Sequence, residues 1–290
     1  MTAAVTRLWP LLLAAVLAAC ATPPTDPLRV TGERLFIPVT VNGIETEALL
    51  DSGAEMTLID AGFARRLGLA YAGEDVARGT GGSQPVRFAE NVSLQAAGFA
   101  EDSVTVAVLD LTDVSARLVG EPVRVVMGRE IFDSGRYFLD IDGQRFERLS
   151  RDTEPPGLAL PLGEERGIRQ LPVRIDGLPP VPADFDLGNG NEVLVGRDYA
   201  EAAGLLDVHP VVGTKPGGGI GGEIERDLLV IDSLTVAGRV FEEVMVAIDP
   251  TPTASSVNIG VPILRHFLIT VDFPEDTVWL QPRPTSEPGP

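Results

Sequence analysis

The sequence predicts an all-β protein built from two homologous lobes that are related by an approximate twofold axis. Three observations lead to this expectation: a series of motifs that occurs twice, a content of 31 glycines and 24 prolines, and the shortness of every stretch with a helical pattern. Frequent glycine and proline are typical of strands joined by tight turns. We therefore expect each lobe to be β-barrel-like, with few short helices.

The duplicated motifs recur in the same order, about 135 positions apart. An alternating strand around Pro38 is matched by one around Pro172, and Asp51 is matched by Asp186. A repeat of this kind predicts two copies of one structural unit. The remaining matched segments are the helix-like stretches 63–69 and 199–205, the glycine-rich turns 79–82 and 219–222, the strands 104–108 and 244–248, and the apolar segments 126–132 and 258–264.

The repeat divides the chain into six segments. We expect a signal peptide, a tether, a first lobe, a linker rich in proline, glycine and glutamate, a second lobe and a loose tail. In the same order, these segments are residues 1–19, 20–33, 34–148, 149–167, 168–282 and 283–290.

The amino terminus has the pattern of an export signal. Arg7 precedes an apolar run over residues 8–19, which is too short to span a bilayer. Residues 17–20, Leu-Ala-Ala-Cys, resemble a bacterial lipobox, in which the cysteine receives a diacylglyceryl group and the preceding peptide is removed. This resemblance implies a protein anchored to the membrane by lipid at Cys20, at the cell envelope and facing the periplasm. The alternatives are an ordinary secretory signal cut near Ala19 and a retained membrane helix.

The charge and the cysteine content argue against a nucleic-acid-binding protein and against a fold held by disulfides. The net charge of −19 becomes −20 once Arg7 is removed, so nucleic acid is not an expected partner. Cys20 is the one cysteine of the chain, so no intrachain disulfide can form. Core burial must therefore hold the fold together in an oxidising compartment.

Residues 34–282 resemble the aspartic peptidase clan, which includes the single-lobe retropepsins and the two-lobe pepsins. Two apolar residues followed by Asp51, Ser52, Gly53 and Ala54 are similar to the clan's aspartate loop. Segments 126–128 and 258–260 resemble the apolar-apolar-glycine segment that crosses beneath each such loop. The resemblance implies that Gly128 and Gly260 let another part of the backbone pass closely.

The resemblance also implies a catalytic pair formed by Asp51 and Asp186, one from each lobe. Two carboxylates a few ångströms apart hold one proton between them and titrate as a unit. The ionised member can take a proton from a shared water while the protonated member hydrogen-bonds the scissile carbonyl. Asp184 is the alternative for the second position, because it lies on the same face of the strand as Asp186. The spacing from Asp51 and the glycine two residues later, Gly188, favour Asp186.

The second aspartate loop departs from the clan pattern. In the clan, the hydroxyl after each aspartate reaches across to the backbone of the other lobe. Ser52 can do this, whereas Leu187 cannot. Asn189 is expected to support the loop by hydrogen bonding to the carboxylate of Asp186.

Two glycine-rich turns are candidate flaps over a bound peptide. The second resembles a retropepsin flap tip, and glycines would let both hairpins bend and exclude water. Plain mobile loops are the alternative, and only one hairpin need act as a flap. The flap residues are Gly79, Thr80, Gly81, Gly82, Gly219, Ile220, Gly221 and Gly222.

Other chemistries have little support in the sequence. His209 and His266 lie outside any nucleophile-base, zinc-binding or phosphate-loop pattern, so no metal or cofactor is expected. We therefore expect an aspartic endopeptidase that acts as a monomer on extended peptide segments of proteins. The alternatives are a peptide-binding lipoprotein that has lost turnover through Leu187, and a dimer that pairs two copies of Asp51.

Overall fold

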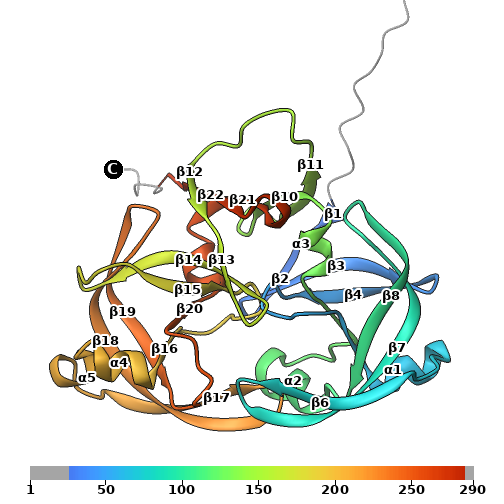
Figure 1. The fold of residues 1–290 in the computed structure, drawn as a ribbon, viewed down its shortest axis with the longest axis horizontal. Helices are drawn as coiled ribbons and strands as arrows, with labels where there is room; N and C mark the ends of the chain where they lie inside the picture. The colour runs from blue at the N-terminus through green and yellow to red at the C-terminus, as the bar shows by residue number, and fades with distance from the viewer. Residues whose placement is uncertain (1–25, 285–290) are drawn as a thin grey trace, which may run out of the picture.

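The computed structural model describes residues 26–284. The predicted signal peptide and the lipid-attachment residue Cys20 lie outside the described residues. Figure 1 shows two β lobes side by side, with a third sheet above them that both halves of the chain build.

The first lobe is an eight-stranded sheet with the strand order β2-β3-β4-β9-β5-β8-β7-β6. Its strands β3 and β7 also pair, which closes part of the sheet on itself. The strands are β2 (Arg29–Thr31), β3 (Arg34–Val41), β4 (Ile44–Leu50), β5 (Leu58–Asp60), β6 (Gly73–Gly79), β7 (Gly82–Ala96), β8 (Phe99–Leu109) and β9 (Val125–Met127).

The second lobe repeats this topology strand for strand, with the order β13-β14-β15-β20-β16-β19-β18-β17. The extra pairing is repeated as well, between β14 and β18. The all-β, two-lobe prediction is therefore confirmed. The strands are β13 (Gly163–Glu165), β14 (Ile168–Ile175), β15 (Val181–Phe185), β16 (Val193–Gly196), β17 (Gly213–Gly219), β18 (Gly222–Val236), β19 (Arg239–Asp249) and β20 (Val257–Ile259).

A six-stranded sheet joins the lobes, because β10 of the first half pairs with β21 of the second. Buried Asp272 on β21 strengthens this junction by bonding Arg136 at 3.0 Å and Arg151 at 2.6 Å. The strands of this sheet are β1 (Asp26–Pro27), β10 (Arg136–Asp140), β11 (Arg145–Leu149), β12 (Leu158–Pro161), β21 (Phe267–Asp272) and β22 (Thr277–Pro282).

The helices are short, as the sequence predicts. Asp60 caps α1 by accepting from the N–H groups of residues 62 and 63, and Gly68 ends it in the left-handed region at φ 67°. The matched helix in the second lobe ends earlier than expected, at Ala202, and Gly204 instead separates α4 from α5. The helices are α1 (Ala61–Leu67), α2 (Thr112–Val114), the π-helix η1 (Ser115–Val119), α3 (Glu130–Asp133), α4 (Arg197–Ala202), α5 (Leu205–Val208), α6 (Val261–Leu264) and the 3₁₀ helix η2 (Phe273–Glu275).

The main apolar core runs through both lobes and the joining sheet. Alternation places Ile37 and Val39 of β3 in this core, and their matches Leu171 and Val173 do the same in β14. Stacked rings of Tyr137 and Phe146, with centroids 5.1 Å apart, fill the base of the joining sheet. This common core fixes the two aspartate loops in relation to each other.

Parts of the predicted tether and of the predicted linker form strands. Strands β1 and β2 lie within the predicted tether, where Leu28 is buried. Strands β12 and β13 lie within the predicted linker, where their partners are β22 and β14. Backbone pairing to existing sheet edges explains this order, since an edge offers unpaired hydrogen-bonding groups. The boundaries of the lobes stay a prediction.

Candidate active site

The two aspartates occupy equivalent positions, directly after β4 and β15. The N–H of Asp51 donates to Met127 O at 3.0 Å, and the N–H of Asp186 donates to Ile259 O at 3.1 Å. Each loop is thus anchored to the strand beside it, β9 or β20. The duplicated sequence therefore produces two matched loops at the junction of the lobes.

The carboxylates of Asp51 and Asp186 lie next to each other at the junction of the two lobes. A Cβ atom placed on Gly53 would lie 3.1 Å from Asp186 Oδ1 and 3.3 Å from Asp51 Oδ1. A Cβ atom on Gly188 would collide with the carboxylate of Asp51. Both loops therefore need glycine at this position to bring the two acids together.

The loops hold their own carboxylates through main-chain donors. Gly53 N donates to Asp51 Oδ1 at 2.9 Å. Gly188 N and Asn189 N donate to Asp186 Oδ1 at 2.9 and 3.1 Å. Ala54, the counterpart of Asn189, donates its N–H to the main-chain oxygen of Asp51 at 3.4 Å. These bonds fix the orientation of both acids before any ligand binds.

The second carboxylate has one more donor, which the sequence did not single out. Asn258 Nδ2 donates to Asp186 Oδ2 at 2.8 Å, and Val126 stands at the matched position of the first lobe. Asn189 supports this contact indirectly, because its side-chain amide donates to Asn258 Oδ1 at 2.8 Å. The expected bond from Asn189 to Asp186 is thus made by its main chain, while its side chain orients Asn258.

Burial and, to a lesser extent, the neighbouring charge of Asp186 together raise the pKa of Asp51 to about 7. Desolvation disfavours the charged form of an acid, and a second carboxylate disfavours it again. The pair therefore retains a proton up to near-neutral pH.

Ser52 links the two lobes at the base of the site. Its hydroxyl donates to Phe185 O at 2.7 Å and accepts from Leu187 N at 2.9 Å. The reciprocal bond is absent because Leu187 has no hydroxyl; its side chain is fully buried in the main core. One half of the cross-lobe lock is therefore present, and apolar packing replaces the other half.

We expect Ser52→Ala to lower the free energy of unfolding by about 2–4 kcal/mol, because it leaves a buried carbonyl and a buried N–H without their partner. Urea denaturation measures this loss. The matched control is Ser103→Ala, which removes an exposed serine hydroxyl that bonds Asn91 at 2.9 Å and should change stability by less than about 0.5 kcal/mol. Equal losses in the two variants would contradict the cross-lobe role of Ser52.

Gly128 and Gly260 lie against the chain that leaves each aspartate loop. A Cβ atom on Gly128 would lie 2.5 Å from the carbonyl carbon of Met56. On Gly260 it would collide with the carbonyl oxygen of Asn189. Next to these glycines, Arg129 N donates to Ala54 O and Val261 N donates to Asn189 O. The close passage implied by the resemblance occurs in both lobes.

The two glycine-rich hairpins meet tip to tip, where β6 and β17 converge in Figure 1. Gly81 N donates to Ile220 O at 3.1 Å, and a Cβ atom on Gly219 would lie 2.6 Å from Thr80 Oγ1. Gly82, Gly221 and Gly222 have φ angles of 129°, 96° and 127°, which favour glycine. The structure therefore brings all eight candidate flap residues into one region.

Arg117 from η1 of the first lobe holds the hairpin of the second lobe. Its guanidinium donates to the carbonyl oxygens of Gly217, Gly219 and Gly222 at 3.2, 3.0 and 3.1 Å. The sequence does not indicate this contact, since a lone arginine in a short helix is usually a surface residue. The hairpins are thus closed over the region between the lobes.

Asp184 is not part of the carboxylate pair. It is 4% exposed and accepts from Gln170 Nε2 at 2.8 Å. It pairs with Asn258 in the sheet, on the same face as Asp186. The structure thus separates two acids that the sequence distinguished by the register with Asp51 and by Gly188.

Arg34 is a second residue near the pair that sequence reasoning missed. It is 3% exposed and lies against Gly190, four residues beyond Asp186. Burial lowers the pKa of its guanidinium, while the charges of Asp186 and Asp51 raise it. Arg34 therefore places a positive charge within electrostatic reach of both acids.

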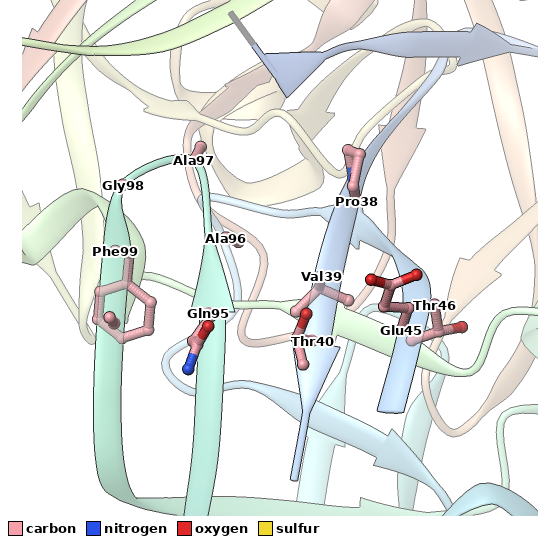
Figure 2. A pocket seen from close by; sticks show the side chains of 11 residues that line it. Pro38, Val39, Thr40, Glu45, Thr46, Gln95, Ala96, Ala97, Gly98 and Phe99 are labelled. Carbon is pink, nitrogen blue, oxygen red and sulfur yellow. The ribbon is translucent and has the colours of Figure 1, made fainter. Parts of the chain in front are cut away.

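A separate groove of about 720 Å³ lies on the first lobe, away from the aspartates (Figure 2). Its walls come from the hairpins β3–β4 and β7–β8, with Pro38, Glu45 and Phe99 among the lining residues. No residue of the aspartate loops lines it.

Residues 26–284 include neither a candidate metal site nor a candidate membrane-spanning helix. No group of three or more His, Cys, Asp or Glu side chains is placed to hold a metal ion within this range. None of the helices in the same range has the length and apolar character needed to cross a membrane.

Residues 37–131 match the model of a family described as aspartyl protease. The matched segment contains the Asp51 loop, the first hairpin and Gly128. A search of curated proteins finds no match. The second lobe lies beyond the matched segment and repeats its topology, including the aspartate loop and the crossing glycine. The first lobe is therefore similar to an aspartyl protease family over residues 37–131, and the second lobe repeats its aspartate loop and its crossing glycine.

Proposed function

We propose that the protein is an aspartic endopeptidase that cleaves extended peptide segments. The contact between the carboxylates of Asp51 and Asp186 carries this proposal. Loops with internal hydrogen bonds hold both acids, and two hairpins cover the region between the lobes. A peptide bound there would be shielded from water, which strengthens hydrogen bonding to its carbonyl group.

The surroundings of the two acids assign them different roles. Asp51, with a pKa raised to about 7, holds the proton and donates to the scissile carbonyl oxygen. Asp186 accepts hydrogen bonds from Gly188, Asn189 and Asn258, which stabilise its negative charge. Asp186 therefore takes a proton from the attacking water. The hydroxide adds to the carbonyl carbon, and the carbonyl oxygen takes the proton of Asp51. Asp186 then gives the proton from the water to the amine nitrogen, Asp51 takes its proton back from the diol oxygen, and the C–N bond breaks to release the amine and the acid.

A peptide-cleavage assay tests the proposed activity. The chain from Ala21 onward is incubated with a mixed peptide library at several pH values, and the products are identified by mass spectrometry. We expect internal cleavage by the unmodified protein and none by Asp51→Asn. No cleavage at any pH between 3 and 8 would overturn the proposed activity.

The alternative is a peptide-binding protein without turnover. Leu187 favours this alternative, because it removes one of the two hydroxyls that would lock the aspartate loops together. In that case peptides should bind to the unmodified protein and to Asp51→Asn with similar affinity, and neither protein should cut them.

We further propose that the protein is a monomer that reaches the cell envelope and is held there by lipid at Cys20, facing the periplasm. The sequence of residues 1–20 supports the export and the anchor. The presence of both aspartates in one chain supports the monomer, since a second copy is not needed to complete the pair. A protein or peptide at the cell envelope would be the substrate.

We expect Cys20→Ser to abolish incorporation of radioactive palmitate in the native host, because the thiol is the acceptor of the lipid. The wild-type protein, labelled in the same cells, is the reference, and gel autoradiography is the readout. Equal labelling of the two proteins would contradict the lipid anchor.

A further inference from the structure

The two lobes, although they share one topology, face the aspartates with side chains of opposite character. A row of paired residues crosses each sheet beside its aspartate loop. In the first lobe the row is Phe36, Leu49, Val126 and Leu58. In the second lobe, by the same strand pairing, it is Gln170, Asp184, Asn258 and Leu194. Three apolar residues have thus become polar.

The row of the first lobe belongs to an apolar cluster that spans the height of the site. Ala54 and Met56 pack against the cluster from the Asp51 loop, and Ile220 packs against it from the tip of the opposite hairpin. A peptide that lies between the aspartates and the hairpin tips would therefore pass along this cluster. We call it the apolar wall. Its buried members are Phe36, Leu49, Leu58, Val86, Ala107, Leu109, Leu111, Val123 and Val126.

The replacement of apolar by polar residues extends to strands β18 and β19 of the second lobe. Val86 and Leu109 of the apolar wall have Arg226 and Asp249 as their counterparts, as the pairing of β7 with β8 and of β18 with β19 shows. Arg226 Nη2 bonds Asp249 Oδ2 at 2.8 Å, and both side chains are buried. This ion pair contributes no net charge.

The remaining polar residues of the second lobe bond one another or the catalytic pair. Gln170 bonds Asp184 at 2.8 Å, and Asn258 bonds Asp186 at 2.8 Å. Burial raises the pKa of Asp184, which favours its neutral form. We call Gln170, Asp184, Arg226, Asp249 and Asn258 the polar wall. It offers hydrogen bonds with little net charge.

The residues at the two hairpin tips also differ in polarity. Ile220, from the second lobe, contacts the apolar wall of the first lobe. Its counterpart Thr80, from the first lobe, places its hydroxyl at the hairpin of the second lobe. The apolar tip residue Ile220 thus lies at the lobe with the apolar wall, and the polar tip residue Thr80 lies at the lobe with the polar wall.

We propose that the site selects peptides with an apolar side chain on one side of the scissile bond and an uncharged polar side chain on the other. Successive side chains of an extended peptide point in opposite directions, so the two flanking residues face different lobes. An apolar residue would bury its surface against the apolar wall. A carboxamide or hydroxyl oxygen would accept from Arg226 Nε of the polar wall, a buried donor without a partner among the described residues, whereas an apolar group would leave this donor unpaired. This inference rests on the proposed peptidase function of the same site.

Leucine and asparagine are nearly equal in shape, so peptides that differ by this exchange test polarity alone. At one flanking position we expect kcat/KM to be about tenfold or more higher for leucine, and at the other about tenfold or more higher for asparagine. Lysine and glutamate at the second position should be cut more slowly than asparagine. Preference for leucine at both positions, or for a charged residue over asparagine, would overturn the inference.

The double variant Arg226→Val/Asp249→Leu copies the residues of the first lobe into the second. Replacing a buried ion pair with apolar residues is often neutral or stabilising, and thermal melting verifies folding. The asparagine preference should fall by about tenfold, while the leucine preference at the other position stays unchanged. The matched control Arg197→Val/Asp227→Leu removes a more exposed ion pair in the same lobe and should leave both preferences intact.

Cleavage with unchanged preferences in Arg226→Val/Asp249→Leu would contradict the polar wall and leave the peptidase function standing. If neither the wild-type protein nor Arg226→Val/Asp249→Leu cuts any peptide, the peptidase function is wrong. Fluorescence anisotropy with the same peptides on Asp51→Asn then still measures the preference for leucine or asparagine at each position. Equal binding of leucine and asparagine peptides at both positions would then overturn the inference as well.

Discussion

Asp186→Asn should lower kcat for peptide cleavage by about 10³-fold or more, while Asp184→Asn should retain most of the activity. Asp186 contacts Asp51 and takes the proton from water in the proposed mechanism, and loss of a positioned acid or base costs rate on this scale. Asp184 bonds Gln170 instead, and asparagine can keep that contact. Initial rates on one cleaved peptide at saturating concentration measure the difference.

The comparison between Asp186→Asn and Asp184→Asn is well matched, because the two residues lie on one face of the same strand end and differ by two positions. Circular dichroism should show that both variants keep the β fold. Full activity in Asp186→Asn, with loss in Asp51→Asn, would contradict a pair formed within one chain and favour pairing of two first lobes. Loss in Asp184→Asn alone would move the second acid to position 184.

The second large effect is a pH-dependent difference in stability between the unmodified protein and Asp51→Asn. In the folded protein Asp51 holds its proton to about pH 7, whereas in the unfolded chain it loses it near 3.8. Between these values the folded state binds more protons than the unfolded state, so the free energy of unfolding falls as the pH rises. The loss approaches ~4 kcal/mol above pH 7, at about 1.4 kcal/mol for each pKa unit.

Asp51→Asn removes this contribution, since asparagine does not titrate. The variant should therefore equal the unmodified protein at pH 4 and exceed its stability by up to ~4 kcal/mol at pH 8. Urea denaturation of both proteins at a series of pH values gives the difference in their free energy of unfolding. The contributions of the other carboxyl groups are the same in both proteins and cancel in this difference. A difference that does not change with pH would show that Asp51 has an ordinary pKa in the folded protein.

Much of the fold could be predicted because duplication leaves a pattern in the sequence. The matched prolines 38 and 172 lie on β3 and β14, and the matched glycines 128 and 260 lie against the aspartate loops. The register with Asp51 and the glycine at position 188 distinguished Asp186 from Asp184. These features follow from local backbone requirements, which a sequence displays directly.

The polar contacts around the site could not be predicted in the same way. Asn258 stands where the first lobe has Val126, and its bond to Asp186 depends on how β20 lies beside β15. The contacts of Arg34 with the second loop, and of Arg117 with the second hairpin, join residues more than 100 positions apart. The order of residues 26–31 likewise depends on sheet edges that form elsewhere in the chain.

The most direct measurement of the central claim is the titration of the Asp51 carboxyl carbon by ¹³C NMR, in the unmodified protein and in Asp186→Asn. If the two acids share a proton across the lobes, Asp51 should titrate near pH 7 in the unmodified protein and at lower pH in Asp186→Asn, where the neighbouring charge is gone. Titration of Asp51 near 3.8 in both proteins would contradict the claim.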